Sequence, residues 1–284
     1  MAVQSKAIKA RIKSVRNTKK ITKAMELVSA SKMRRVVSKT VGTRPYIEHS
    51  LDIIHAIKSP QVTHPLLLTQ KADKSLIVVI TSNKGLCGGY NAQILRTVAS
   101  FLGATDEQYD FVTVGKKGDV TLRQNGSTII AAFEQKLLFT IRDSAAIGDF
   151  VIKQFLTSTY ARVYVAYTEY LSALNQQPQI KQILPFIDET STTSSDLVSD
   201  EYLFEPEADA ILDVVVDKII HTRLYGMLLE SAASEESARM VAMKSASDAA
   251  GEMITDLSLR YNKIRQASIT QEISEISAGM TSSH

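Results

Sequence analysis

The stretch 82–91, SNKGLCGGYN, comes closer than any other segment to a catalytic or ligand-binding motif. It is a glycine-rich loop between a predicted strand and a predicted helix, where α/β proteins bind phosphate groups at a helix N-terminus. Its spacing, however, matches neither G-x-G-x-x-G nor G-x-x-x-x-G-K-S/T, and no acidic residue follows the second predicted strand to bind a ribose. We therefore favour a tight turn that requires positive φ over a nucleotide-binding loop.

The single cysteine, Cys87, lies in this loop and is a poor candidate for a nucleophile. A catalytic cysteine needs a histidine partner, and every histidine lies outside the predicted α/β region. The five are His49, His55, His64, His221 and His284. One cysteine excludes an intramolecular disulfide and a cysteine-based zinc site, and neither the histidine spacing nor the acidic segment 188–217 matches a metal site. The sequence predicts no catalytic residue, metal or cofactor.

Two oppositely charged segments point instead to partners. The stretch 17–35, NTKKITKAMELVSASKMRR, has six cations and one acid, whereas the chain between Lys181 and Lys218 has ten acids and no cation. Basic residues can coat nucleic-acid phosphates, but these alternate with apolar residues around the predicted helix and form no single stripe. The pattern favours enclosure by protein surfaces that carry carboxylates, with separate partners for the two ends. A nucleic-acid-binding coiled coil remains an alternative.

The elements that would position these residues follow from the distribution of helix breakers. Segment 1–41 has no Gly or Pro and segment 207–284 has no Pro, so both ends are predicted to be helical. A helix over the C-terminal segment would be roughly 115 Å long at about 1.5 Å per residue, which is typical of a coiled coil. The last part of the chain repeats apolar residues every seventh position. The predicted rows are Met243, Ala250, Leu257 and Ile264, with Ala246, Met253 and Ala267 adjoining.

The N-terminal apolar stripe is less regular, because Ile8, Ile12 and Val15 share one helix face whereas Ile21, Met25 and Val28 fall on another. This predicts a stripe that migrates around the helix.

The middle of the chain alternates strand and helix patterns, which predicts a small Rossmann-like sheet. Predicted strands are 75–81, 110–115, 161–170 and 179–186, and predicted helices begin near Asn91 and cover 144–156, the latter with Asp143 as N-cap. The fold class is α/β with a long antiparallel coiled coil. The expected domains are a helix over 1–58, an α/β domain over 74–200 and a helix over 207–284.

Three segments in order resemble the gamma subunit of F-type ATP synthases. They are the basic stretch 17–35, the loop 82–91, and the C-terminal segments ASEESARMVAMKSASDAAGEMI and YNKIRQASITQEISEISAGM. The last matches the family ending I-T-x-E-x-x-E-I-x-x-G at Ile269, Thr270, Glu272, Glu275, Ile276 and Gly279. The resemblance covers roughly the first 45 and last 60 residues and the loop, and the region 100–200 matches mainly in its layout.

The resemblance implies a rotor shaft without an active site of its own. Its antiparallel, left-handed coiled coil would lie inside a ring of alpha and beta subunits, and its α/β domain would sit with epsilon on a ring of c subunits at the cytoplasmic face of a bacterial membrane. Proton flow would turn it and drive ATP synthesis, and ATP hydrolysis would reverse it. It would bind no nucleic acid. The alternative from the loop motif is a Rossmann-type nucleotide-binding enzyme.

The resemblance also assigns roles to single residues. Met25 matches a shaft methionine that faces an acidic helix-turn of beta, and Lys84 lies in a loop near the bottom of beta. The other matching coupling positions are Arg239, Arg265, Gln266, Thr270, Glu272 and Ile276. Asn83 and Lys84 replace the common Asp-Arg, and Tyr90 replaces a common aliphatic residue, so local contacts of the loop differ from the family pattern.

Overall fold

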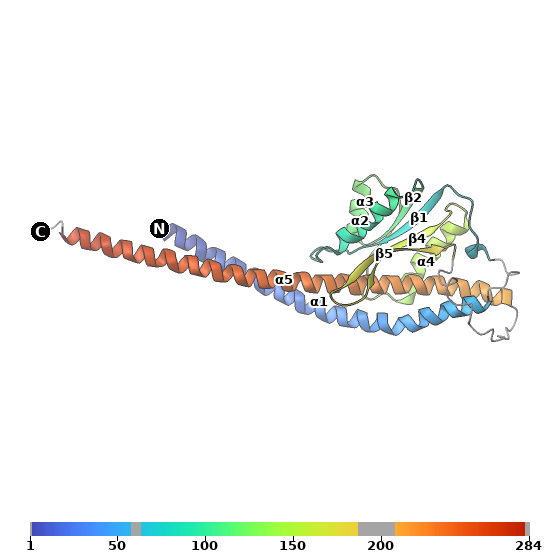
Figure 1. The fold of residues 1–284 in the computed structure, drawn as a ribbon, viewed down its shortest axis with the longest axis horizontal. Coiled ribbons are helices and arrows are strands. Elements are labelled where there is room, and N and C mark those ends of the chain that lie inside the picture. Colours follow the sequence, from blue (N-terminus) through green and yellow to red (C-terminus); the bar gives the residue numbers. More distant parts are fainter. Residues whose placement is uncertain (1, 58–63, 187–207, 282–284) are drawn as a thin grey trace. The chain divides into compact units, whose positions relative to one another are not determined.

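The computed structural model describes residues 2–57, 64–186 and 208–281 (Figure 1). Most of the acidic segment 188–217 lies outside these residues. The elements are α1 (Ala2–Ile57), η1 (Pro65–Leu67), β1 (Lys74–Ile80), α2 (Tyr90–Gly103), β2 (Gln108–Val114), α3 (Lys116–Gln124), β3 (Ile129–Phe133), α4 (Ile141–Leu156), β4 (Val163–Tyr170), β5 (Gln176–Leu184) and α5 (Ala208–Thr281). The chain forms two compact units, Met1–Ser29 with Met240–His284 (the coil unit) and Ala30–Arg239 (the sheet unit).

The sheet unit contains a five-stranded sheet of order β3-β2-β1-β4-β5. Strands β1 to β4 run parallel to one another, and β5 runs antiparallel to β4. Strand β1, predicted over 75–81, is central in the sheet and is buried on both faces, as its unbroken apolar run requires. Leu76, Val78 and Ile80 face a core shared with α4 and α5, whereas Ile77 and Val79 face one shared with α2 and α3. The predicted α/β class is confirmed.

Three details of the sheet unit differ from the sequence predictions. Helix α4 begins at Ile141 with Thr140 as its N-cap, so Asp143 is not the cap but the third helical residue of a capping box. The Thr140 hydroxyl accepts from the Asp143 amide at 3.2 Å, and the Asp143 carboxylate accepts from the Thr140 amide at 2.9 Å. Strand β3 and helix α3 were not predicted, because β3 is short and half-buried and α3 buries only Gly118 and Leu122.

Helix α5 is joined to the sheet through buried serines. The ladder between β4 and β1 ends at Ala166, so the backbone of Thr168 has no partner on β1. Ser231 and Ser234 of α5 replace that partner, since the Ser231 hydroxyl accepts from the Thr168 amide at 3.2 Å and the Ser234 hydroxyl donates to the Thr168 carbonyl at 3.1 Å. Buried backbone groups are almost always paired, and these two serines meet that requirement with side chains of α5.

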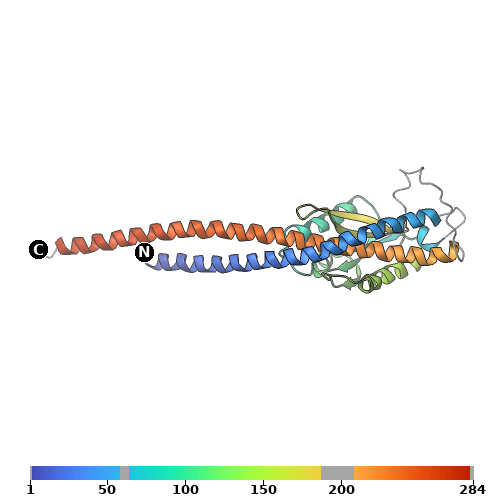
Figure 2. The same ribbon diagram turned by 90° about the horizontal axis from the view of Figure 1, so that it is seen from below.

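In the coil unit, the first part of α1 and the last part of α5 lie side by side (Figures 1 and 2). Lys19 packs on Gly251, where an added Cβ would lie 2.7 Å from the lysine Nζ. Lys6 and Lys9 share a groove with Arg265 and other residues further along α5. Residue numbers therefore rise along one helix as they fall along the other, so the helices are antiparallel as predicted.

The side of α5 that packs against α1, here called the seam, was predicted to consist of two rows of apolar residues. The structure confirms the row that begins at Met243 and contradicts the row that begins at Ala246. Met243, Ala250 and Leu257 are buried, as expected. The adjoining row was placed one residue too early, because Met253 is 46% exposed whereas Ser247 is buried. The prediction chose the row with apolar residues, but small polar side chains such as that of Ser247 also fit between closely packed helices.

The predicted migration of the α1 stripe is wrong for the same reason. Beyond the buried Ile12, the seam continues through Thr22 and Ser29, and Ile21 and Val28 point outward, 61% and 54% exposed. The Thr22 hydroxyl donates to the Lys19 carbonyl at 3.1 Å, which satisfies it inside the seam. Small polar residues therefore take seam positions beside the buried Ile12, while Ile21 and Val28 lie outside.

Candidate functional site

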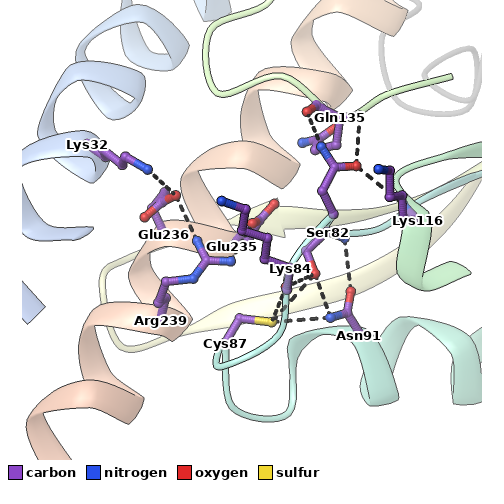
Figure 3. Close-up of polar contacts among 11 residues, drawn as sticks. Lys32, Ser82, Lys84, Cys87, Asn91, Lys116, Gln135, Glu235, Glu236 and Arg239 are labelled. Carbon is purple, nitrogen blue, oxygen red and sulfur yellow. Dashed lines mark hydrogen bonds and ion pairs between the residues drawn. The ribbon is translucent and has the colours of Figure 1, made fainter. Parts of the chain in front are cut away.

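The loop 82–91 is a turn closed by its own side chains (Figure 3). Positive φ occurs at Leu86 (65°) and Gly88 (57°), so the predicted tight turn is confirmed, with one of its two left-handed positions taken by a leucine. Asn91 closes the loop from the start of α2, because its Oδ1 accepts from the Ser82 amide at 3.0 Å and its Nδ2 donates to the Ser82 hydroxyl at 2.7 Å. Its Nδ2 also lies 3.2 Å from the buried Cys87 Sγ.

A second asparagine joins the loop to its neighbours at the carboxyl edge of the sheet. The Asn83 Nδ2 donates to the Gln135 carbonyl at 2.7 Å, and its Oδ1 accepts from the amides of Lys116 and Gln135 at 3.3 and 3.4 Å. The side chain thus bridges the first residue of α3 and the segment after β3. The edge at which a Rossmann-type enzyme would bind its cofactor is bridged here by the protein's own side chain.

Substitution of Asn91 by alanine is expected to expose the Cys87 thiol. Without the amide that joins Ser82 to Cys87, the loop would open more often, and thiol modification follows the open population. We expect reaction with a thiol-specific disulfide reagent to be about tenfold faster or more, which corresponds to roughly 1.4 kcal/mol.

The matched control is Asn125→Ala, at the end of α3, where only the backbone of Asn125 caps the helix. Equal thiol rates for both variants and the unchanged protein would contradict the role given to Asn91.

Beside the loop, α5 carries a buried cluster of charges (Figure 3). The Arg239 guanidinium donates to Glu236 at 2.7 Å and to Glu235 at 2.5 Å, and all three side chains are about nine-tenths buried. Lys32 of α1 lies 3.8 Å from the same Glu236 oxygen. Burial raises the pKa of Glu235, and Arg239 opposes that rise. The cluster joins both long helices within the sheet unit.

Tyr90 links the loop to this part of α5. Its side chain is buried, and burial, followed by the charge of Glu235, raises the pKa of its hydroxyl well above the ordinary value. Ser231, which bonds to β4, also lies beside the hydroxyl. The residue that departs from the family pattern is therefore packed against the turn of α5 that holds the sheet.

The structure does not bring the eight predicted coupling residues together. Lys84 is exposed in the loop and Met25 is half-buried on α1. The five residues near the end of α5 are exposed, namely Arg265, Gln266, Thr270, Glu272 and Ile276. Arg239 differs from all of these, because its charged group is buried against Glu235 and Glu236. Sequence reasoning missed both glutamates, although their spacing of three and four residues from an arginine on a helix signals such pairs.

The residues considered for catalysis form no catalytic arrangement in the described segments. The polar contacts of Cys87 involve Ser82, Asn91 and the Lys84 carbonyl. His221, expected to lie outside the α/β region, instead packs on α4, with its Nε2 2.9 Å from Asp149. Over residues 2–57, 64–186 and 208–281, no group of three His, Cys, Asp or Glu side chains could hold a metal ion.

The outer surface of the coil unit combines apolar and basic side chains. Ile21 and Leu27 are each about 60% exposed, among the lysines and arginines of α1. A groove of about 580 Å³ is lined by Lys6, Lys9, Lys13, Arg16 and Lys20 together with Ala10, Ile12 and Asn17. None of the helices in the described part of the chain has a stretch apolar enough to cross a membrane.

Comparison with known proteins gives consistent matches over nearly the whole chain. Residues 4–282 match a family model described as ATP synthase. The ATP synthase gamma chain of Acidithiobacillus ferrooxidans (strain ATCC 53993 / BNL-5-31) is 38% identical over 286 residues, which cover 97% of this chain and 98% of the relative. That of Lachnoclostridium phytofermentans is 38% identical over 281 residues, covering 96% of each.

Solved structures have the same fold. A chain of the central stalk and c-ring of Tetrahymena thermophila mitochondrial ATP synthase is 26% identical with a TM-score of 0.62, covering 80% of this chain and 99% of that one. A chain of the OSCP/F1/c-ring assembly of Euglena gracilis mitochondrial ATP synthase has a TM-score of 0.72 at 19% identity, covering 100% and 96%.

Proposed function

The chain belongs to the ATP synthase gamma chain family, and on this premise we propose that it is the central rotor shaft, which mechanically couples proton flow to ATP synthesis and hydrolysis. The observation that carries the proposal is the coil unit. Two antiparallel helices there have a seam that combines small side chains with Ile12, Met243 and Leu257, and an exterior of cations and exposed apolar residues. Nothing in the comparisons supports the alternative of a Rossmann-type nucleotide-binding enzyme.

The proposed partners are the alpha and beta subunits of a catalytic ring around the coil unit, and epsilon and a c-subunit ring at the sheet unit. The chain would act at the cytoplasmic face of a bacterial cell membrane and contact it only through the c ring. It would have no active site of its own and bind no nucleic acid. The absence of an active site is supported by the carboxyl edge of the sheet, where the Asn83 side chain bridges the start of α3 and the segment after β3.

Exposed coupling residues suit a shaft that must make and break contacts. At an effective dielectric near 20, two charges 4 Å apart attract by roughly 4 kcal/mol, but exposed pairs retain only about 0–1 kcal/mol after solvation and entropy. Lys84, Arg265 and Glu272 are exposed and would form such weak pairs with ring subunits. The buried Arg239 would instead keep the shaft itself together.

The proposal is tested by direct observation of rotation. Because Cys87 is buried, a Lys153→Cys substitution on the exposed surface of α4 provides a single reactive thiol for a visible probe. In the purified complex with its ring immobilised, ATP is expected to drive stepwise, unidirectional rotation of the probe. A stationary probe on a complex that hydrolyses ATP would refute the rotor assignment.

Substitution of Met25 by lysine is expected to reduce coupling. Met25 is half-buried on α1, and by family resemblance it faces an acidic helix-turn of beta. An added cation would form one additional pair, worth up to about 1 kcal/mol, that must break at each step. The ratio of protons pumped to ATP hydrolysed should fall about two- to fivefold in vesicles.

The control is Leu27→Lys, on the outward surface two residues away, which should alter the ratio less. An unchanged ratio in the Met25 variant would argue against the assigned position of this residue.

A further inference from the structure

Two buried hydroxyl groups beside the loop 82–91 have no hydrogen-bond partner among the residues that the structure describes. They belong to Tyr90, which begins α2 and is 3% exposed, and to Thr168 of β4, which is 2% exposed. Buried polar groups are almost always paired, because an unpaired one loses its bonds to water and gains none in return. Both hydroxyls therefore point to a bound partner.

A third hydroxyl, that of Ser231 on α5, lies beside these two. Its oxygen accepts from the Thr168 amide at 3.2 Å, which fixes Ser231 against β4. Burial, and next the charge of Glu235, raise the pKa of Tyr90, whereas the neighbouring hydroxyls of Ser231 and Thr168 lower it. The three hydroxyls are therefore neighbours, although the Tyr90 hydroxyl bonds directly to neither of the others.

The elements that carry these hydroxyls meet beyond the end of the ladder between β1 and β4. Ala166 is the last residue of β4 that pairs with β1, and Thr168 lies two residues further on. Ser231 and Ser234 of α5 bond to the backbone of Thr168, and Tyr90 approaches from the start of α2. The backbone of Thr168 thus has its partners within the protein, whereas its side chain has none in the described segments. A small polar site lies between α2, β4 and α5.

The chemistry of this site suits a water molecule. A buried water typically makes about three hydrogen bonds, and it both donates and accepts, as hydroxyl groups do. The raised pKa keeps Tyr90 protonated, so its hydroxyl can donate as well as accept. A cation is less well matched, because hydroxyl oxygens are neutral and the nearby Glu235 already pairs with Arg239.

We propose that a water molecule binds between the hydroxyls of Tyr90, Thr168 and Ser231 and joins the start of α2 to β4 and α5. It bonds to all three hydroxyl oxygens and so completes the hydrogen bonding of Tyr90 and Thr168. Because it bridges three elements, it holds the end of the loop 82–91 against the long helix. The site lies within the sheet unit and goes beyond the proposed function, since it does not depend on whether the chain is a rotor shaft.

The direct test is a crystal structure of the full chain at a resolution that shows ordered water. We expect a peak of electron density at hydrogen-bonding distance, about 2.7–2.8 Å, from each of the three hydroxyl oxygens. A direct bond between Tyr90 and Thr168 without such a peak would overturn the proposal. A metal ion at the peak, identified by shorter bonds, would also overturn it.

Substitution of Tyr90 by phenylalanine tests the site through the sign of the stability change. Loss of a hydroxyl that bonds to the water should lower the folding equilibrium constant about three- to tenfold, as for one lost hydrogen bond. Loss of an unpartnered hydroxyl should instead raise the constant, because the cost of burying that group disappears. Urea denaturation of the full chain measures the change, and an unchanged or raised constant would overturn the proposal.

A double substitution shows whether Tyr90 and Thr168 share one water. Thr168→Val should also lower the constant, and since both substitutions disturb the same water, their losses of folding free energy should add to less than their sum. The matched control combines Thr168→Val with Tyr109→Phe. The Tyr109 hydroxyl contacts Thr105 and Glu107 near the start of β2, at the opposite edge of the sheet from Thr168. The control losses should add fully, and full additivity for the Tyr90 pair as well would overturn the proposal.

Discussion

Replacement of Arg239 by glutamine is expected to lower the free energy of unfolding of the chain by about 3–5 kcal/mol, because it leaves two buried carboxylates without their cation. The Arg239 guanidinium contacts both Glu235 and Glu236, and Lys32, at 3.8 Å, is too distant and too exposed to replace it. Urea denaturation followed by circular dichroism measures the change. In the complex, the same variant should lose coupled proton pumping if the cluster keeps α1 and α5 together.

Arg123→Gln is the matched control, because it removes an arginine that pairs with a carboxylate at the same helical spacing but in solvent. Its stability should hardly change. The loss of stability in Arg239→Lys should be larger than that in Arg123→Gln and smaller than that in Arg239→Gln, because one ammonium cannot bond both glutamates as the planar guanidinium does. A loss below about 1 kcal/mol for Arg239→Gln would mean that the glutamates find other partners.

Substitution of Gly115 by alanine is expected to destabilise the sheet unit by roughly 3 kcal/mol or more, or to prevent folding. Gly115 has φ of +100°, and an added Cβ would lie 2.1 Å from the carbonyl oxygen of Thr81. This clash is with backbone, so no side-chain rotation relieves it. Because Gly115 connects β2 to α3 beside the end of β1, the loop 82–91 should also be displaced, which the Cys87 reaction rate would report.

Substitutions at two other glycines distinguish the effect of positive φ from the effect of the steric clash. Gly126 also has positive φ, +77°, but no atom lies within 4 Å of its added Cβ, so Gly126→Ala should cost only about 1–2 kcal/mol. Gly42 lies within α1 with open space around it, and Gly42→Ala should stabilise the protein by up to about 1 kcal/mol. Similar losses at 115 and 126 would show that backbone conformation, and not the clash, determines the effect.

Much of the fold could be predicted because its main elements have strong periodic signals. The apolar run of β1 indicated a strand buried on both faces, and the spacing of Met243, Ala250 and Leu257 indicated one seam of a coiled coil. The prediction of the buried helix face failed where a polar residue is buried or an apolar residue is exposed. Thr22 and Ser29 lie inside while Ile21 lies outside, a reversal that depends on how closely two helices approach.

The functional residues were harder to predict, because the sequence does not reveal which side chains the fold uses internally. Family resemblance gave Arg239 the same kind of role as Arg265, yet one is buried in a charge cluster and the other is exposed. Lys84 was placed in the correct loop, but the bridge made by its neighbour Asn83 depends on the unpredicted start of α3. The coupling roles of the exposed residues stay predictions.

The reversed seam of the coil unit has a consequence for how the shaft survives before assembly. Thr22 and Ser29 supply little apolar burial where they lie in the seam, whereas Ile21, Leu27 and Val28 remain in water. Proteases should therefore nick the free polypeptide preferentially within 2–29 and 240–281, and spare these segments once neighbouring subunits cover them. Under the proposed function, assembly would then favour early capture of the newly made chain by its partner subunits.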